Sequence, residues 1–382
     1  METVSRLLGG EQSNSSLLFG DRLNLKLLRH YEAGPHPDTD LLRVLEEQKF
    51  PHVPRYCGEI RCMKDGRHGT VALLTSYVPN QGEAWTYTLD ALAMFFDNTL
   101  SISSLEDGHK ILFDLTANYP ERARQLGLRT GELHQCLGTL SGNDFAAESF
   151  TSFYQRSLYQ SLRSLARRTE LELVRKIPNL PQDLQEDAKA WIAEGASLLN
   201  FYAKLLNRKI FAKKIRVHGD YHLGQVLNTG KDFVILDFEG EPRRSLGERL
   251  LKRSPLVDIA GMLRSFDYAI HTALAQQRPE DHTRLAPWCE LWKKLVVSEF
   301  LEGYLSGIKD STLLPQTSDD FVFLLDVFLL DKAIYEIGYE LHYRPDLLAT
   351  PLRAALHLLQ TLDANKLIAG IFEKFTQAQQ TV

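Results

Sequence analysis

The sequence lacks the features that would place the protein in a membrane, outside the cell or on a nucleic acid. It has no apolar stretch of about 18 residues, the length that a membrane-spanning helix needs. Its N-terminus, METVSRLLGGEQ, has no apolar run behind a basic start, so we expect no signal peptide. No lysine- or arginine-rich tract dominates a chain of net charge −5, which argues against nucleic-acid and membrane-surface partners.

Cysteine is also scarce, with four residues in 382. Only Cys57 and Cys62 lie close together, and no second pair completes a zinc site. We therefore expect reduced thiols in a cytoplasmic protein. The remaining composition, 44% hydrophobic and 24% charged, is that of a soluble globular protein. Its length allows two or three folding units or one bilobal enzyme.

Residues 1–80 have the pattern of a small β-rich lobe, which we predict to bind a nucleotide. Two strand patterns flank Gly20-Asp21, as in a hairpin turn. A helical pattern and a further strand pattern follow. The expected strands are Ser15–Phe19, Leu23–Leu28 and Gly69–Val78, and the expected helix is Pro37–Gln48.

Residues 81–382 are expected to form a larger, mostly helical lobe, joined to the first lobe at Asn80–Asp90. Apolar residues recur there with the 3.6-residue period of a helix, and one β-rich island, Arg216–Glu239, interrupts them. The predicted fold class is therefore α+β, with a small β-rich N-lobe and a large helical C-lobe. The expected helices are Gln125–Leu137, Ser149–Thr169, Gln182–Asn207, Trp288–Ser306 and Phe321–Tyr343.

The segment Val217–Pro242, VHGDYHLGQVLNTGKDFVILDFEGEP, has the strongest functional pattern in the chain. Two strand-like stretches flank a turn at Gly230–Lys231, and this hairpin brings Gln225 opposite position 236. The loop that enters the hairpin ends at the same place. Four oxygen-bearing side chains are therefore expected to converge at the open end of the hairpin: Asp220, Gln225, Asp237 and Glu239.

Such a group suits the transfer of a phosphoryl group from ATP to a hydroxyl. One carboxylate orients the attacking hydroxyl, while an amide oxygen and further carboxylates hold Mg²⁺ against the phosphates. Protein kinases have the same order, H-x-D-x4-N followed by D-F. We assign Asp220 as the candidate catalytic residue and Gln225, Asp237 and Glu239 as candidate metal ligands. Any one acidic residue could instead cap a solvated hairpin, but their joint spacing favours the catalytic interpretation.

Lys26 is the candidate phosphate ligand of the β-rich lobe. It alternates with Leu25 and Leu27, so it points to the opposite face of its strand, and pairing across the turn puts it opposite about Ser15. The adjacent loop 9–14, GGEQSN, offers backbone N–H groups to phosphates. A lone exposed lysine is more often solvated, but the hairpin favours a functional one. The candidate nucleotide-binding residues are Ser13, Asn14, Lys26, Asp40, Ser76 and Val78, with ATP and Mg²⁺ as cofactors.

A candidate sugar-binding face lies on the helical pattern Val327–Pro345. Aromatic and charged residues there recur at i, i+3, i+4, i+7 and i+11. Rings cover the C–H faces of a sugar and charged groups bind its hydroxyls, although a half-buried helix explains the pattern equally well. The residues are Lys332, Tyr335, Glu336, Tyr339 and Tyr343. His222 is a further candidate for substrate contact or for shaping its loop.

Three other polar residues are interpreted as structural. His134 lies among apolar neighbours on a helix and is expected to be a core histidine. His218 is expected to shape its loop. Asp258 lies in the first turn of a helix, where it favours the helix dipole or braces the catalytic loop.

The sequence resembles bacterial maltokinases, members of the protein-kinase-like superfamily that includes aminoglycoside phosphotransferases. The resemblance implies a bilobal kinase that makes maltose 1-phosphate from maltose and ATP, in the route from trehalose to α-glucan (glycogen). It implies that Asp220 is the base, that Gln225 and Asp237 hold magnesium, that Lys26 contacts phosphate, and that the face from Lys332 to Tyr339 lines the sugar site. The matching blocks are EQSN (11–14), LNLKLLRHYEAGPHPD (23–38), VHGDYHLGQVL (217–227), ILDFEGEP (235–242), SPLVDIAGMLRSFDYA (254–269) and LDKAIYEIGYELHYRP (330–345).

The sequence departs from this family at two places. The cap domain that usually precedes EQSN is missing, as expected for a compact member or for part of a fusion with trehalose synthase, the expected partner. Asp40 stands where similar sequences have the glutamate offered to Lys26, and its side chain is shorter. The alternative acceptor is another small sugar or amino sugar, such as glucosamine. A regulatory pseudokinase is disfavoured because Lys26, Asp220, Gln225 and Asp237 are all present.

Overall fold

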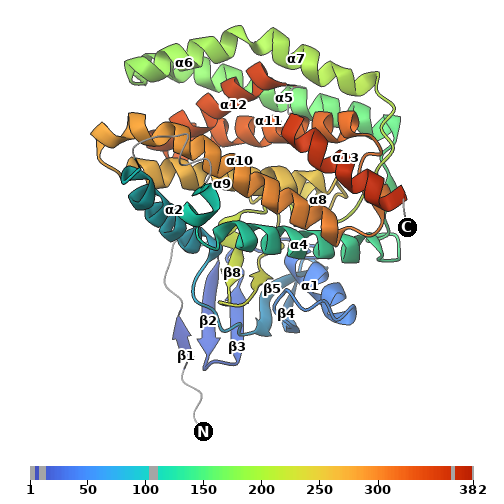
Figure 1. Cartoon of the computed structure of the whole chain (residues 1–382). Helices are drawn as coiled ribbons and strands as arrows, with labels where there is room; N and C mark the ends of the chain where they lie inside the picture. The colour runs from blue at the N-terminus through green and yellow to red at the C-terminus, as the bar shows by residue number, and fades with distance from the viewer. Residues whose placement is uncertain (1–4, 8–13, 103–110, 363–365, 381–382) are drawn as a thin grey trace.

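The computed structural model of the protein describes residues 5–7, 14–102, 111–362 and 366–380 and has two lobes of unequal size (Figure 1). A small lobe built on an antiparallel sheet lies below a larger stack of helices. The predicted α+β class, with a small β-rich N-lobe and a large helical C-lobe, is confirmed.

The small lobe has a five-stranded sheet in the order β1-β2-β3-β5-β4, together with one helix. The predicted strands and helix are all present, within two residues of their predicted ends. Strand β4 was not predicted, because its sequence YCGEIRCMK lacks a regular apolar alternation and shifts register twice against β5. The elements are β1 (Ser5–Leu7), β2 (Ser15–Phe19), β3 (Leu23–Leu27), α1 (Pro37–Glu47), β4 (Tyr56–Lys64) and β5 (Arg67–Ser76).

The large lobe contains the helices that follow β5. The five predicted helices are present, but the pattern Gln182–Asn207 is broken at Glu194 into two helices and a 3-10 turn. The predicted connector Asn80–Asp90 is also too long, since the first helix already begins at Ala84. The helices are α2 (Ala84–Leu100), α4 (Tyr119–Gly138), α5 (Ser152–Lys176), α6 (Gln182–Ala193), α7 (Gly195–Ala203), α8 (Leu246–Arg249), α9 (Leu256–Ala275), α10 (His282–Gly307), α11 (Ser318–Tyr343), α12 (Ala349–Thr361) and α13 (Lys366–Gln380).

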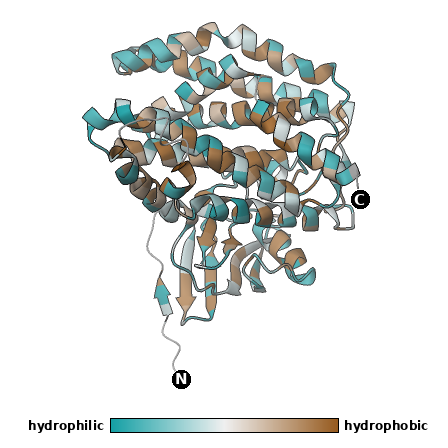
Figure 2. Cartoon of the chain, in the orientation of Figure 1, coloured by the Kyte–Doolittle hydropathy of each residue, from teal (hydrophilic) through white to brown (hydrophobic). Residues whose placement is uncertain are grey.

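The core of the large lobe is centred on α11. Every residue from Phe321 to Leu330 is buried, and the helix contacts α5, α9, α12 and α13. In Figure 2 the helices in the middle of the stack carry much of the hydrophobic colour, whereas the helices above them alternate hydrophobic and hydrophilic residues. None of the helices in the described ranges is long and apolar enough to cross a membrane.

Helices α4 and α10 pack closely because glycines lie at their contact. A Cβ built at Gly303 would lie 1.9 Å from the carbonyl oxygen of Arg124, and one built at Gly127 would lie 1.9 Å from that of Phe300. Larger residues would force the two helices apart. This packing matters for the site, since α4 lies directly behind the loop that enters the β8–β9 hairpin.

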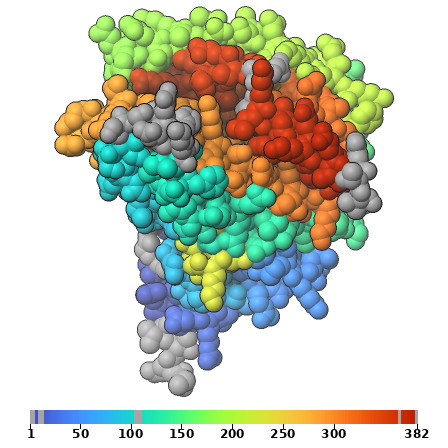
Figure 3. Space-filling model, viewed as in Figure 1, coloured from blue at the N-terminus to red at the C-terminus, as the bar shows by residue number. Residues whose placement is uncertain are grey.

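Two short antiparallel strand pairs complete the fold. One pairs β6 (Glu148–Ser149) with β7 (Lys213–Lys214), and the other pairs β8 (Val226–Asn228) with β9 (Phe233–Ile235). In Figure 3 the yellow β8–β9 segment lies between the blue small lobe and the green and orange helices. The segment with the strongest functional pattern therefore lies where the two lobes meet.

Candidate active site

The β8–β9 hairpin has the register predicted from the sequence. Val226 pairs with Ile235, and the amide of Leu236 donates to the carbonyl oxygen of Gln225 at 2.8 Å. At the open end, Nε2 of Gln225 donates to a carboxylate oxygen of Asp237 at 3.1 Å. Asp237 has a φ of 64°, a left-handed conformation that turns the chain sharply after β9.

The first charged cluster joins the hairpin to the small lobe. Nζ of Lys26 lies 3.0 Å from Asp38, 2.5 Å from Asp237 and 2.6 Å from Glu239. Oxygens of these three carboxylates lie within 4.8 Å of one another. Asn14, another candidate, donates to Glu239 at 2.6 Å. The structure thus brings together residues that lie more than 200 positions apart in the sequence.

Burial and charge act against each other in this cluster. Burial disfavours the ammonium of Lys26, but the three carboxylates outweigh it, so the pKa of Lys26 lies well above its ordinary value. Burial likewise opposes ionisation of Asp237, yet Lys26 holds the pKa of that carboxyl below its ordinary value. At Glu239 burial prevails and raises the pKa. Three carboxylates share one cation, which leaves the cluster with an excess of negative charge.

Asp38, and not Asp40, is the acidic residue of α1 that contacts Lys26. The second oxygen of Asp38 accepts the amide of Phe238 at 3.0 Å, so Asp38 also ties α1 to the segment after β9. Asp40 instead accepts from Arg43 at 3.1 Å. Residues two apart on a helix lie about 200° apart around its axis. Asp40 is therefore not the partner of Lys26, in keeping with its shorter side chain, and Asp38 was not predicted, although an acidic residue directly after Pro37 was a signal for it.

The other nucleotide-binding candidates lie around this cluster or outside it. Lys26 pairs with Ser16 rather than with the predicted Ser15. Ser76 ends β5, and its hydroxyl accepts the amide of Arg55 at 3.0 Å. Val78 lies in the connector between the lobes, where its carbonyl oxygen accepts from Asn80 at 2.8 Å. Ser13 lies outside the described residues, as does most of the loop 9–14.

A second charged cluster lies on the side of the large lobe. Nζ of Lys332 on α11 lies 3.0 Å from Asp220 and 3.1 Å from Glu241. The hydroxyl of Tyr335 donates to the other oxygen of Glu241 at 2.5 Å. Burial opposes ionisation of Asp220, but Lys332 outweighs it and holds the pKa of this carboxyl below its ordinary value. Glu241 was not predicted from the sequence, although the alternation of acidic residues along DFEGEP was a signal for it.

The predicted sugar-binding face of α11 is divided by its neighbours. Lys332 and Tyr335 point toward Asp220 and Glu241, as described above. Glu336 instead faces α9, where it accepts from the guanidinium of Arg264 at 3.0 and 2.8 Å. Tyr339 packs against Tyr343 with ring centroids 4.9 Å apart, and Tyr343 is 61% exposed. The five residues thus line three environments rather than one continuous face.

The pair of Glu336 and Arg264 leads to a stability prediction. We expect Glu336→Ala to lower the free energy of unfolding by about 3 kcal/mol, because a fully buried guanidinium loses the carboxylate oxygen that accepts two of its N–H bonds. Asp267, 2.8 Å from Arg264, remains as a second partner and limits the loss. Denaturant unfolding measures the effect, and Tyr343→Ala on the exposed face serves as the control, with an expected change of about 0.5 kcal/mol or less. An unchanged unfolding midpoint for Glu336→Ala would show that the pair contributes no net stability.

The loop before the hairpin is held from behind by Asp258 on α9. Its two carboxylate oxygens accept the amides of His218 at 2.8 Å and Gly219 at 2.9 Å. His134 on α4 is fully buried between Asp258 and Tyr304, 3.0 and 3.1 Å away. His134 therefore lies in the core, as predicted. Asp258 braces the loop, which is one of the two roles predicted for it.

The two histidines of the loop, His218 and His222, also have local partners. Nε2 of His218 donates to the carbonyl oxygen of Leu236 at 2.7 Å, so His218 ties the loop to the end of β9. Nδ1 of His222 accepts the amide of Gly224 at 3.1 Å. Burial lowers the pKa of His222, although Asp220 opposes this effect. Both histidines therefore shape the loop.

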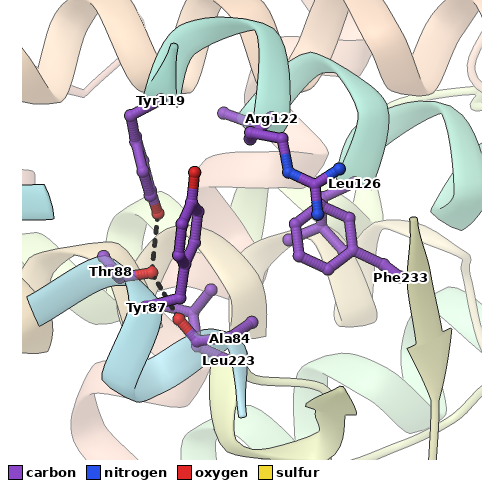
Figure 4. A pocket seen from close by; sticks show the side chains of 9 residues that line it. Ala84, Tyr87, Thr88, Tyr119, Arg122, Leu126, Leu223 and Phe233 are labelled. Atoms are coloured by element: carbon purple, nitrogen blue, oxygen red, sulfur yellow. Dashed lines mark hydrogen bonds between the residues drawn. The ribbon is translucent and has the colours of Figure 1, made fainter. Parts of the chain in front are cut away.

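The side of the hairpin away from the charged clusters packs tightly on α2 and α4 (Figure 4). The guanidinium of Arg122 lies 4.2 Å from the ring centroid of Phe233 and donates to Asn228 at 2.8 Å. The cavity whose lining side chains are drawn there, among them Tyr87, Tyr119 and Arg122, has a volume of about 10 Å³. That volume holds at most about one water molecule, so this region is packing that fixes the hairpin rather than a ligand site.

Comparison with known proteins gives distant relatives and a shared fold. No family model matches the sequence. A glucosamine kinase of Streptacidiphilus jiangxiensis is 22% identical over 298 residues, and a glucosamine kinase of Mycolicibacterium smegmatis is 24% identical over 280 residues. These matches cover 77% and 72% of this chain, and the chain spans about 60% of the length of each relative.

A solved structure agrees over more of the chain. It is a glucosamine kinase in complex with glucosamine, ADP and inorganic phosphate, with a TM-score of 0.70 and 19% sequence identity. The alignment covers 94% of this chain and 76% of that chain, so the two proteins share a fold. The names of these proteins mention neither maltose nor trehalose synthase, the acceptor and the partner that the maltokinase resemblance implied.

Proposed function

We propose that the protein is a kinase that transfers the γ-phosphoryl group of ATP to a hydroxyl of a small amino sugar, with glucosamine as the first candidate. The observation that carries the proposal is the position of Asp220. Its carboxylate lies in one charged cluster with Lys332 and Glu241, while Asp237 and Glu239 lie in the other with Lys26. The cluster around Lys332 suits an acceptor, and the cluster around Lys26 suits phosphates.

The nucleotide side has the donors that a metal–phosphate complex needs. Lys26 is proposed to contact the phosphates, with Asn14, Ser13, Ser76 and Val78 as further nucleotide contacts. The converging oxygens of Asp38, Asp237 and Glu239, with Gln225 beside them, are hard ligands of the kind that Mg²⁺ prefers. Bound there, Mg²⁺ would offset the negative charge of the phosphates.

On the acceptor side, Asp220 acts on the hydroxyl. The hydroxyl oxygen forms a bond to the γ-phosphorus, and the bond from that phosphorus to the β–γ bridging oxygen breaks with its electron pair passing to ADP. The hydroxyl proton passes to the carboxylate of Asp220, which is ionised at neutral pH because Lys332 outweighs the effect of burial. The products are a sugar phosphate, ADP and one proton.

The charges around the acceptor side favour an amino sugar over the maltose of the maltokinase resemblance. Asp220 and Glu241 contribute two negative charges around the single ammonium of Lys332. A protonated amino sugar offsets this excess, whereas a neutral disaccharide does not. The names of the relatives support the same choice of acceptor.

The test is an acceptor panel with purified protein and Mg-ATP. Glucosamine, glucose and maltose are assayed in parallel by ADP release, and ³¹P NMR identifies the phosphorylated product. We expect glucosamine to have the highest kcat/KM. Turnover of maltose with none of glucosamine would replace the acceptor, and turnover of no sugar would overturn the proposed function.

A further inference from the structure

The segment Asp237–Glu241 lies between two lysines that come from different lobes. Lys26 of β3 contacts Asp237 and Glu239, whereas Lys332 of α11 contacts Glu241. Asp237 and Glu239 thus lie on the nucleotide side, and Glu241, two residues further along the chain, lies on the acceptor side. A phosphoryl group that moves from ATP to the acceptor passes from the first cluster to the second.

Lys332 is the cation at Asp220 within the described parts of the chain. No other lysine or arginine there lies within 4.0 Å of this carboxylate. Tyr221, the next residue, is uncharged and is hydrogen-bonded to Thr130 in the core. His222 accepts the amide of Gly224 with Nδ1 and is therefore a neutral imidazole. The cation for this loop comes from α11, more than 100 residues further along the chain.

The transfer step creates an electrostatic problem that Lys332 is placed to relieve. Asp220 is an anion, and the phosphoryl group that approaches the acceptor hydroxyl beside it also carries negative charge. The repulsion is strong in a buried site. The side chain of Lys332 is mostly buried, yet it stays an ammonium ion, because Asp220 and Glu241 outweigh the effect of burial on its pKa.

The hydrogen bonds of Lys332 leave one donor for this purpose. An ammonium group has three N–H bonds. One donates to Asp220 at 3.0 Å and a second to Glu241 at 3.1 Å. Glu241 is held in turn by the hydroxyl of Tyr335, so the direction of the ammonium is fixed by two carboxylates and a phenol. Within the described parts of the chain this ammonium has no further hydrogen bond, and the ring centroid of Tyr335 lies 5.3 Å from Nζ, so the third N–H is available to a bound substrate group.

We propose that Lys332 is a catalytic residue whose third N–H donates to an oxygen of the phosphoryl group during its transfer. This inference rests on the proposed kinase function and differs from the sequence prediction, in which Lys332 binds sugar hydroxyls. Lys332 keeps its proton throughout, because the hydroxyl proton passes to Asp220. Glu241 and Tyr335 are positioning residues that act through Lys332.

The test compares Lys332→Met, which removes the charge, with Lys332→Arg, which keeps it. Loss of one preorganised donor to the transition state costs about 10²–10³-fold in kcat. We expect that loss for Lys332→Met with little change in the KM of the acceptor, and at least a tenfold recovery for Lys332→Arg. Thermal unfolding of each variant checks that the protein still folds when the carboxylates of Asp220 and Glu241 lose their ammonium partner.

Binding of a transition-state mimic tests the contact directly. Mg-ADP with aluminium fluoride imitates the transferring phosphoryl group, whereas Mg-ADP alone lacks it. We expect Lys332→Met to weaken the fluoride complex by about 100-fold and to leave the affinity for Mg-ADP unchanged. Wild-type affinity for the fluoride complex would overturn the proposal, as would a rise in the acceptor KM at unchanged kcat. This measurement needs no acceptor, so it remains informative if the acceptor panel overturns the proposed function.

Discussion

Replacing Asp220 with asparagine is expected to lower kcat by about 10²–10⁴-fold, the usual contribution of a general base. Asparagine keeps the shape of the side chain and an oxygen for Lys332, which lies 3.0 Å away, but it cannot accept the hydroxyl proton. The fold and the affinity for Mg-ATP are expected to stay close to those of the wild type, because Asp220 does not contact the nucleotide cluster around Lys26.

Steady-state kinetics with the best acceptor of the panel measures this effect. Asp97→Asn, an exposed aspartate on α2, is the matched control and is expected to retain full activity. Turnover of Asp220→Asn within a few-fold of the wild type would remove Asp220 from the mechanism. A large fall in unfolding temperature would instead indicate that Asp220 mainly stabilises Lys332.

Replacing Asp237 with alanine is expected to abolish magnesium-dependent binding of ATP. Asp237 lies 2.5 Å from Lys26, the candidate phosphate ligand, and 3.1 Å from Gln225, a candidate metal ligand. Loss of an outer-shell partner of a metal typically costs about 10–100-fold in affinity, and we expect loss of a direct ligand to exceed that range. Lys26 keeps Asp38 and Glu239 as partners, so the fold is expected to survive.

Calorimetric titration with Mg-ATP, and with ATP plus a chelator, measures this loss. Asp40→Asn is the matched control, because Asp40 pairs with Arg43 and does not contact Lys26. Its affinity for Mg-ATP is expected to equal that of the wild type. Unchanged affinity of Asp237→Ala would place the metal elsewhere, and a loss in Asp40→Asn equal to that of Asp237→Ala would revive the original prediction for Asp40.

Elements whose partners are close in sequence could be predicted. Strands β2 and β3 were predicted close to their observed bounds and the hairpin β8–β9 in its observed register, because a turn and alternating apolar residues define a hairpin locally. Strand β4 could not be predicted in this way, because its apolar residues do not alternate regularly. One of its edges has no neighbouring strand in the described sheet, and most of its side chains are exposed. The break at Glu194 also escaped prediction, since apolar periodicity continues across it.

In the candidate site, too, contacts within one segment could be predicted, whereas contacts between separate elements could not. The amide and carboxylate at the open end of the hairpin, Gln225 and Asp237, were predicted to meet, and they do so at 3.1 Å. Asp38 and Glu241 were missed, because each finds its lysine across the interface of two separate elements. Glu336 was assigned to the sugar face on helical spacing alone, but the buried Arg264 of α9 draws it to another side.

The α+β class and the register of the β8–β9 hairpin followed from the sequence alone, since periodicity, turns and residue spacing within one segment define them. Only the tertiary structure decided which carboxylate faces which ammonium. Ionic contacts between Lys26, Asp38 and Glu239, or between Lys332, Asp220 and Glu241, depend on how a sheet, two helices and a hairpin pack. Helical and strand periodicity define the faces of an element but not the neighbour that each face meets.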